Sequence, residues 1–252
     1  MGFEWVDGRV WDSFNGKCTL LTFMAEIALL DFNDGHPNLG CEALRQTAIA
    51  HGHDVKCIDV RGGQPLPKQF DAVLTSGGPG SPLEDSAWSG PLFEWLGNVL
   101  ENATPILAIC YGFQMLSRVS GGQLVAQKNS RFGIYELSAT EAGKEDPWLA
   151  PAVPSAVFLQ HRFVLKSLNA QVLAMGSEGD VLAARFGRAA VGCMFHPEAC
   201  PETARRWFEN PDIQKKLEER LGTDRSEAMV RNIPFLERSN RALLHGFLSC
   251  LS

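Results

Sequence analysis

The chain has 252 residues, a hydrophobic content of 45% and a formal net charge of −6 at neutral pH. This composition excludes a disordered or collagen-like chain, and an acidic chain without a basic run is not expected to bind nucleic acid or an anionic membrane. The longest apolar run, residues 18–30, contains Glu26 and is shorter than the roughly 20 residues that span a bilayer. Seven cysteines without a CxxC pair, and an acidic start instead of a signal peptide, predict a reduced cytoplasmic protein.

The first part of the chain alternates between strand-like and helix-like patterns. Residues 1–23 do not fit this alternation and are expected to form an N-terminal extension, with translation starting at Met1 or at Met24. Strands are predicted at 27–32, 54–60, 70–75 and 105–110, and helices at 39–51, 88–101 and 113–119. Such alternation predicts an α/β fold with an open, doubly wound and mostly parallel sheet of flavodoxin-like type.

The pattern changes after residue 122. Short apolar pieces at 133–137, 156–159, 163–165, 172–175 and 181–186 are expected to add antiparallel strands to the sheet, followed by one more strand at 190–195. The rest is expected to be helical, with one helix from Asn210 to Gly222 and another after Pro234. Residues 24–208 are expected to form one domain, and 209–252 a helical segment packed on it.

The last predicted helix has an apolar stripe of Leu236, Leu243, Leu244, Phe247 and Leu251. A stripe this apolar is not expected to face water. It either packs on the chain's own sheet or forms the surface that meets a partner.

A cysteine lies where a buried strand passes directly into a helix, within residues 105–116. The small residues Ala108 and Gly112 allow the sharp turn of a nucleophile elbow. The first turn of a helix favours a thiolate and leaves the N–H of Tyr111 free for an oxyanion. An isolated cysteine is more often a buried structural residue, but this context favours Cys110 as a nucleophile.

A glycine-rich turn, Ser76-Gly77-Gly78-Pro79-Gly80, follows the third predicted strand. Most glycine-rich turns are only turns, and this one lacks the GxxxxGK[ST] and GxGxxG patterns that bind nucleotide phosphates. At the carboxyl end of a neighbouring strand, it could offer a second backbone N–H to the oxyanion.

His196 and Glu198 flank a proline just after the last predicted strand. The residue before a proline is extended, and residues two apart in an extended chain face the same side. Glu198 can therefore orient the ring of His196, which can serve Cys110 as a base. An isolated His-x-Glu is more often a surface pair, but the cysteine elbow elsewhere in the chain favours a catalytic triad.

These three elements, in this order, resemble the class I (triad) glutamine amidotransferases. Members of that family carry a Gly-Gly-Pro turn, a Cys-x-Gly-x-Gln elbow and a terminal His-Pro-Glu. The resemblance covers about residues 25–208, and the elbow is similar to that of the amidotransferase domain of GMP synthetase. It implies that Cys110 is the nucleophile, His196 the general base and acid, and Glu198 the orienting carboxylate.

The resemblance also implies groups that bind the substrate. Gly78 and Tyr111 would supply the N–H groups of an oxyanion hole. Segment 158–163 resembles the family's segment around a histidine that lines the glutamine site. Arg162 replaces a residue that is usually small, and it either meets a carboxylate of a larger γ-glutamyl substrate or is a solvated surface residue. The substrate-binding residues implied in this way are Gln114, His161, Arg162 and Phe163.

The implied reaction is hydrolysis of the γ-amide of glutamine through a γ-glutamyl thioester, without a metal or cofactor. The family passes the ammonia to a synthetase, and no ATP-binding loop is recognised in this sequence. Either a separate synthetase subunit receives the ammonia, or the protein works alone. Two alternatives stay open, a stand-alone γ-glutamyl amide or peptide hydrolase and a non-catalytic interaction protein.

Overall fold

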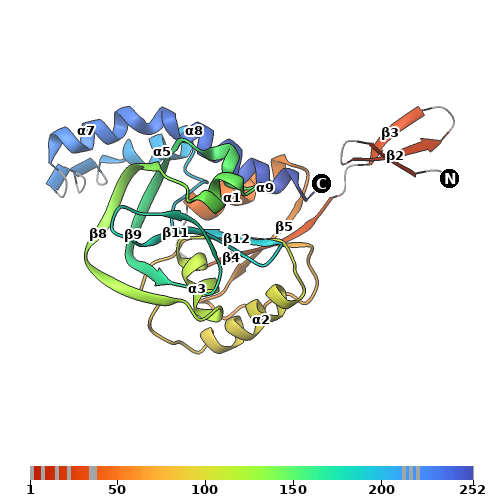
Figure 1. Cartoon of the computed structure of the whole chain (residues 1–252), viewed down its shortest axis with the longest axis horizontal. Helices are drawn as coiled ribbons and strands as arrows, with labels where there is room; N and C mark the ends of the chain where they lie inside the picture. Colours follow the sequence, from red (N-terminus) through yellow and green to blue (C-terminus); the bar gives the residue numbers. More distant parts are fainter. Residues whose placement is uncertain are drawn as a thin grey trace.

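The structure, a computed structural model, describes residues 3–6, 9–14, 17–21, 24–33, 39–211, 214–215, 218–219 and 222–251. In this part of the chain a nine-stranded sheet forms the centre of the molecule (Figure 1). Five of its strands lie parallel in the order β5, β4, β6, β7 and β12. Their bounds are Asp54–Asp59 for β5, Glu26–Asp31 for β4, Ala72–Thr75 for β6, Ile106–Ile109 for β7 and Ala190–Cys193 for β12.

This strand order confirms the predicted fold class. Numbered along the chain, the five parallel strands lie in the order 2-1-3-4-5, which is the order of flavodoxin-like sheets. In such sheets, ligands bind beyond the carboxyl ends of the strands. The glycine-rich turn follows β6, Cys110 follows β7, and His196 lies shortly after β12. The topology therefore brings three segments that are distant in sequence to one edge of the sheet.

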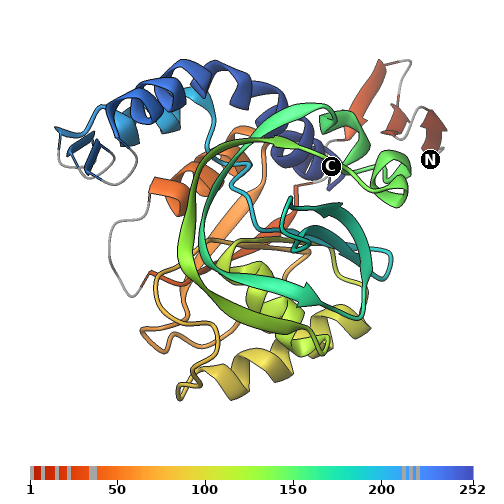
Figure 2. The same ribbon diagram turned by 60° about the vertical axis from the view of Figure 1, so that its left-hand side comes forward.

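Helices cover both faces of the parallel strands, as Figures 1 and 2 show. Helix α1 (Leu39–Ala50) lies on one face together with the C-terminal helices, and α2 (Ser89–Glu101) and α3 (Tyr111–Val119) lie on the other. All residues of β6 and β7 are consequently buried. Burial on both faces explains why these strands are continuous apolar runs instead of alternating patterns.

Antiparallel strands extend the sheet beyond β12. Strand β11 (Val181–Phe186) pairs with β12, with β10 (Gln171–Met175) and with β9 (Ser155–Ser167). Strand β9 pairs in turn with the long strand β8 (Gln123–Leu137), which curves across Figure 2. The pieces predicted at 156–159 and 163–165 are thus one strand, and the piece predicted at 133–137 begins earlier. Hydrophobic patterning missed these stretches because backbone pairing between β8 and β9 holds them, and many of their side chains are polar and partly exposed.

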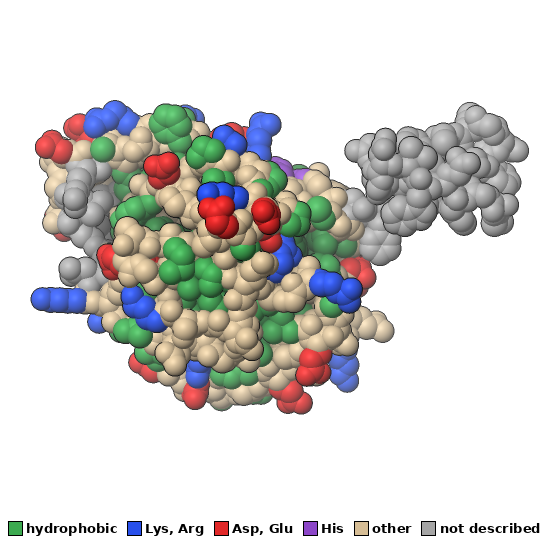
Figure 3. Space-filling model, viewed as in Figure 1, with side chains coloured by type: hydrophobic (Ala, Val, Ile, Leu, Met, Phe, Trp, Pro, Cys, Tyr) green, Lys and Arg blue, Asp and Glu red, His purple; other side chains and the backbone are tan. Residues whose placement is uncertain are grey.

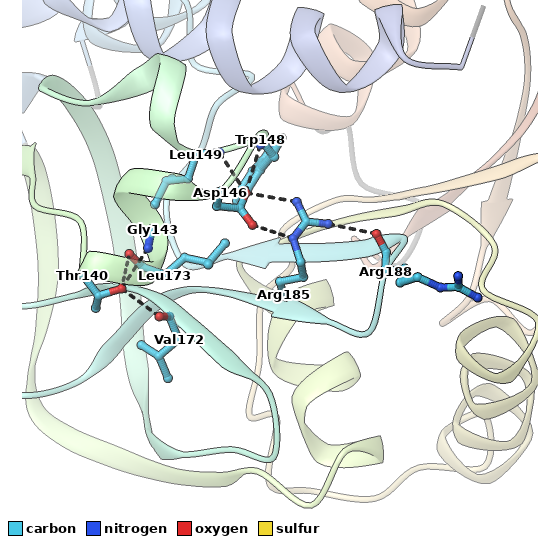
Figure 4. A network of polar contacts seen from close by, with 9 residues as sticks. All are labelled: Thr140, Gly143, Asp146, Trp148, Leu149, Val172, Leu173, Arg185 and Arg188. Atoms are coloured by element: carbon cyan, nitrogen blue, oxygen red, sulfur yellow. Dashed lines mark hydrogen bonds and ion pairs between the residues drawn. The ribbon is translucent and has the colours of Figure 1, made fainter.

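A polar network ties the antiparallel strands to the segments around them (Figure 4). Arg185 of β11 donates to both carboxylate oxygens of Asp146, at 2.5 and 3.0 Å. The same carboxylate accepts hydrogen bonds from the backbone N–H groups of Trp148 and Leu149. The indole N–H of Trp148 in turn donates to the carbonyl of Leu243, so the network reaches the C-terminal helices.

The chain after β12 is largely helical. Its described elements are α5 (Pro201–Phe208), α7 (Thr223–Asn232), η2 (Ile233–Phe235), α8 (Leu236–Ser239), a π-helical turn η3 (Asn240–His245) and α9 (Gly246–Ser249). The helix predicted from Asn210 to Gly222 lies partly outside the described residues. The helix predicted after Pro234 is present as the run from η2 to α9.

The apolar stripe of the last helices packs against the chain itself. Leu243, Leu244 and Phe247 are buried and belong to the same hydrophobic cluster as the central strands. Leu236 is buried in a second cluster with Phe158 of β9. The stripe therefore contributes to the core of the molecule and is covered without a partner.

Truncation of a buried leucine in this stripe is expected to destabilise the protein. Leu244→Ala removes a side chain that is 0% exposed, and the remaining cavity should lower the free energy of unfolding by about 2–5 kcal/mol. Phe235→Ala is the matched control because Phe235 is 64% exposed and its truncation should change stability by less than about 0.5 kcal/mol. Urea denaturation measures both; equal effects would contradict the burial of the stripe.

The N-terminal residues form a separate small sheet. Strands β1 (Phe3–Val6), β2 (Arg9–Phe14) and β3 (Lys17–Leu21) pair antiparallel with one another, and the described residues show no pairing between them and the central sheet. The apolar pattern indicates no element in this stretch, and its role as an extension stays a prediction. Among the described helices, none has the length and apolar character that a membrane crossing requires.

Charged side chains of both signs are scattered over the face of the molecule in Figure 3. Lysine and arginine side chains on this face lie singly or beside acidic ones and form no continuous basic patch there. Nucleic-acid binding depends on such a patch to neutralise the phosphates. This face therefore offers no electrostatic footprint for a nucleic acid.

Candidate functional site

Cys110 occupies a strained corner between β7 and α3. Its φ of 48° and ψ of −103° lie in a region that L-residues rarely adopt. The corner is held by the hydrogen bond from Cys110 N–H to the carbonyl of Cys193 in β12, at 2.7 Å. Gly112 lies so close to β6 that a Cβ atom would be 1.7 Å from Thr75 Oγ1. The elbow expected from the sequence is therefore present, and it requires glycine at position 112.

The glycine-rich turn packs directly against the elbow. A Cβ atom added to Gly77 would lie 3.0 Å from Cε1 of His196 and 3.6 Å from Cβ of Cys110. In the described part of the chain, the N–H of Gly78 donates to no acceptor. The N–H of Tyr111, the first residue of α3, has no intrahelical partner either. Two backbone donors are thus available beside the thiol.

His196 and Glu198 form a buried pair next to the cysteine. The ring Nδ1 of His196 is 2.7 Å from Oε1 of Glu198, and since a carboxylate only accepts, Nδ1 carries the hydrogen. The Glu198 side chain is 1% exposed. The ring Nε2 is buried and has no hydrogen-bond partner among the described residues. The backbone N–H of His196 donates to the carbonyl of Phe158 in β9, which anchors the main chain at this residue.

The charges around His196 favour its protonated form. Burial lowers the pKa of the imidazole, but the negative charges of Glu198 and Cys110 outweigh burial and raise it to about 10. At neutral pH the ring is therefore an imidazolium beside the cysteine. A positioned imidazolium can give a proton to a leaving group and take one back from water.

Strand β9 crosses the elbow and lines the other side of the site. The carbonyl of Phe163 accepts hydrogen bonds from Nε2 of Gln114, at 3.1 Å, and from Nδ1 of His161, at 3.2 Å. The thiol of Cys110 lies 3.7 Å from the carbonyl of Gln160. The structure thus brings Gln114, His161 and Phe163 together. Gln160 lies in the same predicted segment, 158–163, and contributes its backbone carbonyl, which no side-chain motif singles out.

His161 is neutral in this environment. Burial lowers its pKa to about 4, and the positive charge of Arg131 acts in the same direction. Arg131 is itself held by Asp180, with both guanidinium nitrogens within 2.9 Å of the carboxylate oxygens. Arg162 is different from these residues because its side chain is exposed and has no ion pair or hydrogen bond with the described residues. Arg162 is therefore not brought into the buried part of the site.

Two cavities lie near these residues. One of about 270 Å³ is lined by Glu198, Cys200, Thr203 and Asn240 among others, so it lies behind the His196–Glu198 pair. The other, of about 740 Å³, lies between residues 60–70 and α2, and its lining includes none of the residues Cys110, His196 and Glu198. The larger cavity is thus not the proposed reaction centre. Within the described residues, no group of three His, Cys, Asp or Glu side chains is arranged to hold a metal ion.

Comparison with known proteins agrees with this geometry. The family model described as "Glutamine amidotransferase class-I" matches residues 39–212, which is more than half of the chain. The chain belongs to the class I glutamine amidotransferase family. The matched residues include the turn, the elbow and the His-Pro-Glu segment, so the resemblance stated from the motifs is confirmed.

This amidotransferase is similar to curated proteins that are named as GMP synthases. It is 24% identical over 193 residues to a glutamine-hydrolysing GMP synthase of Chlorobaculum tepidum, and 29% identical over 177 residues to one of Aeropyrum pernix. The alignments cover 71% and 68% of this chain but 35% and 32% of those proteins, so the chain spans about a third of their length. 

Solved structures with low sequence identity share its fold. A glutamine amidotransferase from Thermotoga maritima has a TM-score of 0.70 at 21% identity, covering 89% of this chain and 95% of that chain. One from Methylobacillus flagellatus has a TM-score of 0.75 at 15% identity, covering 91% and 96%. The similarity extends over most of the amidotransferase, including regions outside the motifs.

Proposed function

We propose that this amidotransferase hydrolyses the γ-amide of glutamine, with Cys110 as the nucleophile, His196 as the general acid and base, and Glu198 as the carboxylate that orients His196. Family membership supports hydrolysis of a glutamine amide in general terms. The observation that carries the assignment of residues is the strained elbow of Cys110 beside the buried His196–Glu198 pair.

The proposed reaction begins with attack of the Cys110 thiolate on the amide carbon of glutamine. The N–H groups of Gly78 and Tyr111 hold the oxyanion of the tetrahedral intermediate, and each such donor contributes on the order of 10²–10³ in rate. The imidazolium of His196 gives its Nε2 proton to the amide nitrogen, so the C–N bond breaks and ammonia leaves. A γ-glutamyl thioester on Cys110 results, and His196 is now neutral.

Water completes the cycle. Neutral His196 takes a proton from a water molecule as that water attacks the thioester carbonyl, and the same two N–H groups hold the second oxyanion. Collapse of this intermediate breaks the C–S bond, releases glutamate and restores the thiolate–imidazolium pair. Glu198 keeps Nδ1–H occupied in both steps, so Nε2 is always the nitrogen that exchanges the proton.

Steady-state release of glutamate tests this proposal. The purified protein is given glutamine and γ-glutamyl dipeptides, each as the sole substrate. Turnover of glutamine supports the proposal. Turnover of dipeptides alone would replace it by the second candidate below, and turnover of neither in the presence of a synthetase would favour a non-catalytic interaction protein.

We propose further that a separate synthetase receives the ammonia. The curated relatives, of which this chain covers about a third, are named as glutamine-hydrolysing synthases, which supports transfer of the ammonia to a synthetase. In that case the isolated chain should show weak glutaminase activity, because binding of a partner on the turn can further restrict the Gly77–Gly78 peptide to the orientation in which the Gly78 N–H is available to the oxyanion. Adding an ATP-dependent synthetase that binds this chain should raise glutamate release on the order of tenfold to a hundredfold. High activity on glutamine without the partner, and no increase with it, would contradict partner control.

The second candidate is a stand-alone γ-glutamyl amide or peptide hydrolase that uses the same residues. The side chain of Arg162, next to His161 in β9, favours it, because it is exposed and has no ion pair or hydrogen bond among the described residues, so this cation could meet the carboxylate of a larger substrate. Arg162→Ala would then raise KM for γ-glutamyl dipeptides and leave glutamine turnover unchanged. Arg188→Ala serves as the control because Arg188 is also exposed but its side chain points away from the neighbouring network (Figure 4).

A further inference from the structure

The carbonyl oxygen of Gly77 in the glycine-rich turn is held by two side chains. Ser76 Oγ donates to it at 2.7 Å, and Nδ2 of Asn33 donates to it at 3.2 Å. Asn33 follows β4, so it reaches the turn from the neighbouring strand of the sheet. Asn33 lies outside the motifs that identify the site.

These two hydrogen bonds to the Gly77 carbonyl also fix the direction of the N–H of Gly78. A peptide bond is planar and trans, so the carbonyl of Gly77 and the N–H of Gly78 point to opposite sides of one rigid unit. While Ser76 and Asn33 bind the oxygen, the N–H must point away from them. That N–H has no acceptor within the described chain, which leaves it free for a ligand.

The orientation of the Asn33 amide follows from its neighbours. Besides the carbonyl of Gly77, the amide faces Oδ1 of Asp31, at 2.8 Å from Nδ2. Both neighbours only accept hydrogen bonds, so the NH₂ group and not the oxygen must face them. Asp31 also accepts the backbone N–H of Asn33 at 3.0 Å, which anchors the residue. Both hydrogens of the amide are thus used, one on each acceptor.

Strands β4 and β6 connect this arrangement to the rigid sheet. Ser76 N–H donates to the carbonyl of Leu30 at 3.0 Å, and Phe32 N–H donates to Ser76 Oγ at 3.3 Å. Ser76 therefore uses its one hydroxyl hydrogen on Gly77 and accepts from Phe32. At the far end of the turn, Arg61 donates to the carbonyl of Pro79. The Gly77–Gly78 peptide thus lies between anchored residues and can change orientation only by rotating as a unit.

We propose that Asn33 is a positioning residue that keeps the Gly77–Gly78 peptide in the orientation in which Gly78 N–H is available to the reacting oxyanion. This inference rests on the proposed function. Rotation of the peptide would break the bonds from Asn33 and Ser76 and turn a carbonyl oxygen, instead of an N–H, toward the oxyanion. Loss of Asn33 therefore makes the unproductive orientation more accessible while the thiol, His196 and Glu198 stay in place.

Two substitutions of Asn33 test the proposal. Asn33→Ala removes one of the two donors to Gly77, and kcat should fall on the order of tenfold. Asn33→Asp places a carboxylate beside two other acceptors, which repels the carbonyl of Gly77 and attracts the N–H of Gly78, so its loss should be larger. Because the oxyanion forms only in the transition state, KM should stay within about twofold. Asn98→Ala, in an exposed position of α2, is the matched control.

Alkylation of Cys110 by iodoacetamide separates positioning from general damage. This reaction needs the thiolate but forms no oxyanion, so its rate at Cys110, followed by peptide mass spectrometry, should stay within about twofold in both variants. Crystal structures of the wild type and Asn33→Asp supply a readout that does not depend on turnover, and the Gly77–Gly78 peptide should be reversed in the variant.

An unchanged kcat in both variants, or an alkylation rate that falls together with kcat, would overturn the role of Asn33. If the wild-type protein releases no glutamate from any substrate, the proposed function fails instead. The crystal structures still decide the inference in that case. A reversed peptide in Asn33→Asp would support it, and an unchanged peptide would overturn it.

Discussion

Replacement of Cys110 by alanine is expected to reduce glutamate release from glutamine by at least about 10⁴-fold, since no thioester can form without the sulfur. The nucleophile and its base act as a unit, so the remaining oxyanion donors retain only a small part of the acceleration. The assay is release of glutamate, measured with and without a synthetase partner. Cys57→Ala is the matched control, because Cys57 is exposed and lies outside the elbow; its activity should match the wild type.

The loss must not be caused by unfolding, and the backbone at Cys110 provides a check. A φ of 48° suits glycine better than alanine, so Cys110→Gly should melt no lower than Cys110→Ala. At an ordinary helix or strand position the order would be the reverse, by about 0.5–1 kcal/mol. Lower stability of the glycine variant would contradict the strained elbow, and a loss of activity much smaller than about 10⁴-fold in either variant would contradict the role of the thiol.

Removal of the imidazole in His196→Ala is expected to lower turnover by about 10³–10⁴-fold, because both proton transfers lose their carrier. Glu198→Gln should cost less, since an imidazole whose ring is poorly oriented still exchanges protons. Equal losses in the two variants would contradict the assignment of Glu198 as the orienting group. Circular dichroism confirms that each variant is folded.

The His196–Glu198 pair also predicts how the free energy of unfolding depends on pH. The pKa of His196 is raised from 6.5 to about 10 in the folded protein, so the folded state binds this proton more tightly than the unfolded state. The stabilising contribution is complete below pH 6.5 and is lost as the pH rises from there to about 10. Glu198→Gln removes a charge that raises this pKa, so its free energy of unfolding should fall less steeply over that range. Urea denaturation at several pH values measures the slopes, and equal slopes would contradict the coupling.

Local sequence patterns were sufficient to predict the parallel strands of the sheet and the helices between them. Strands buried on both faces are continuous apolar runs, and the strand-to-helix corner at Cys110 needs small neighbours at Ala108 and Gly112, so both are visible in the sequence. The predicted fold class is confirmed for the same reason. The roles of Cys110, His196 and Glu198 stay predictions, although the structure brings these side chains together.

Contacts across strands could not be predicted in this way. The extent of β8 and β9 depends on backbone pairing. Because many of their side chains are polar and partly exposed, these strands show no alternation of apolar and polar residues in the sequence. Arg131 and Asp180 are 49 positions apart, and Asn33 and Gly77 are 44 apart. Their side chains meet only after the sheet has formed. Cys57 likewise has no motif around it, although a hydrogen bond with Cys41 lowers its pKa to about 7.

Because the pKa of the Cys57 thiol is lowered, a reagent directed by the substrate is the most direct test of Cys110 as the nucleophile. A diazoketone analogue of glutamine reacts only where its glutamate part is bound and its carbonyl meets an activated thiolate. Peptide mass spectrometry should find one label per chain on Cys110, with labelling slowed by glutamine and absent from Cys110→Ala. Labelling of Cys57, Cys193 or Cys200 in place of Cys110, or labelling that glutamine does not slow, would contradict it.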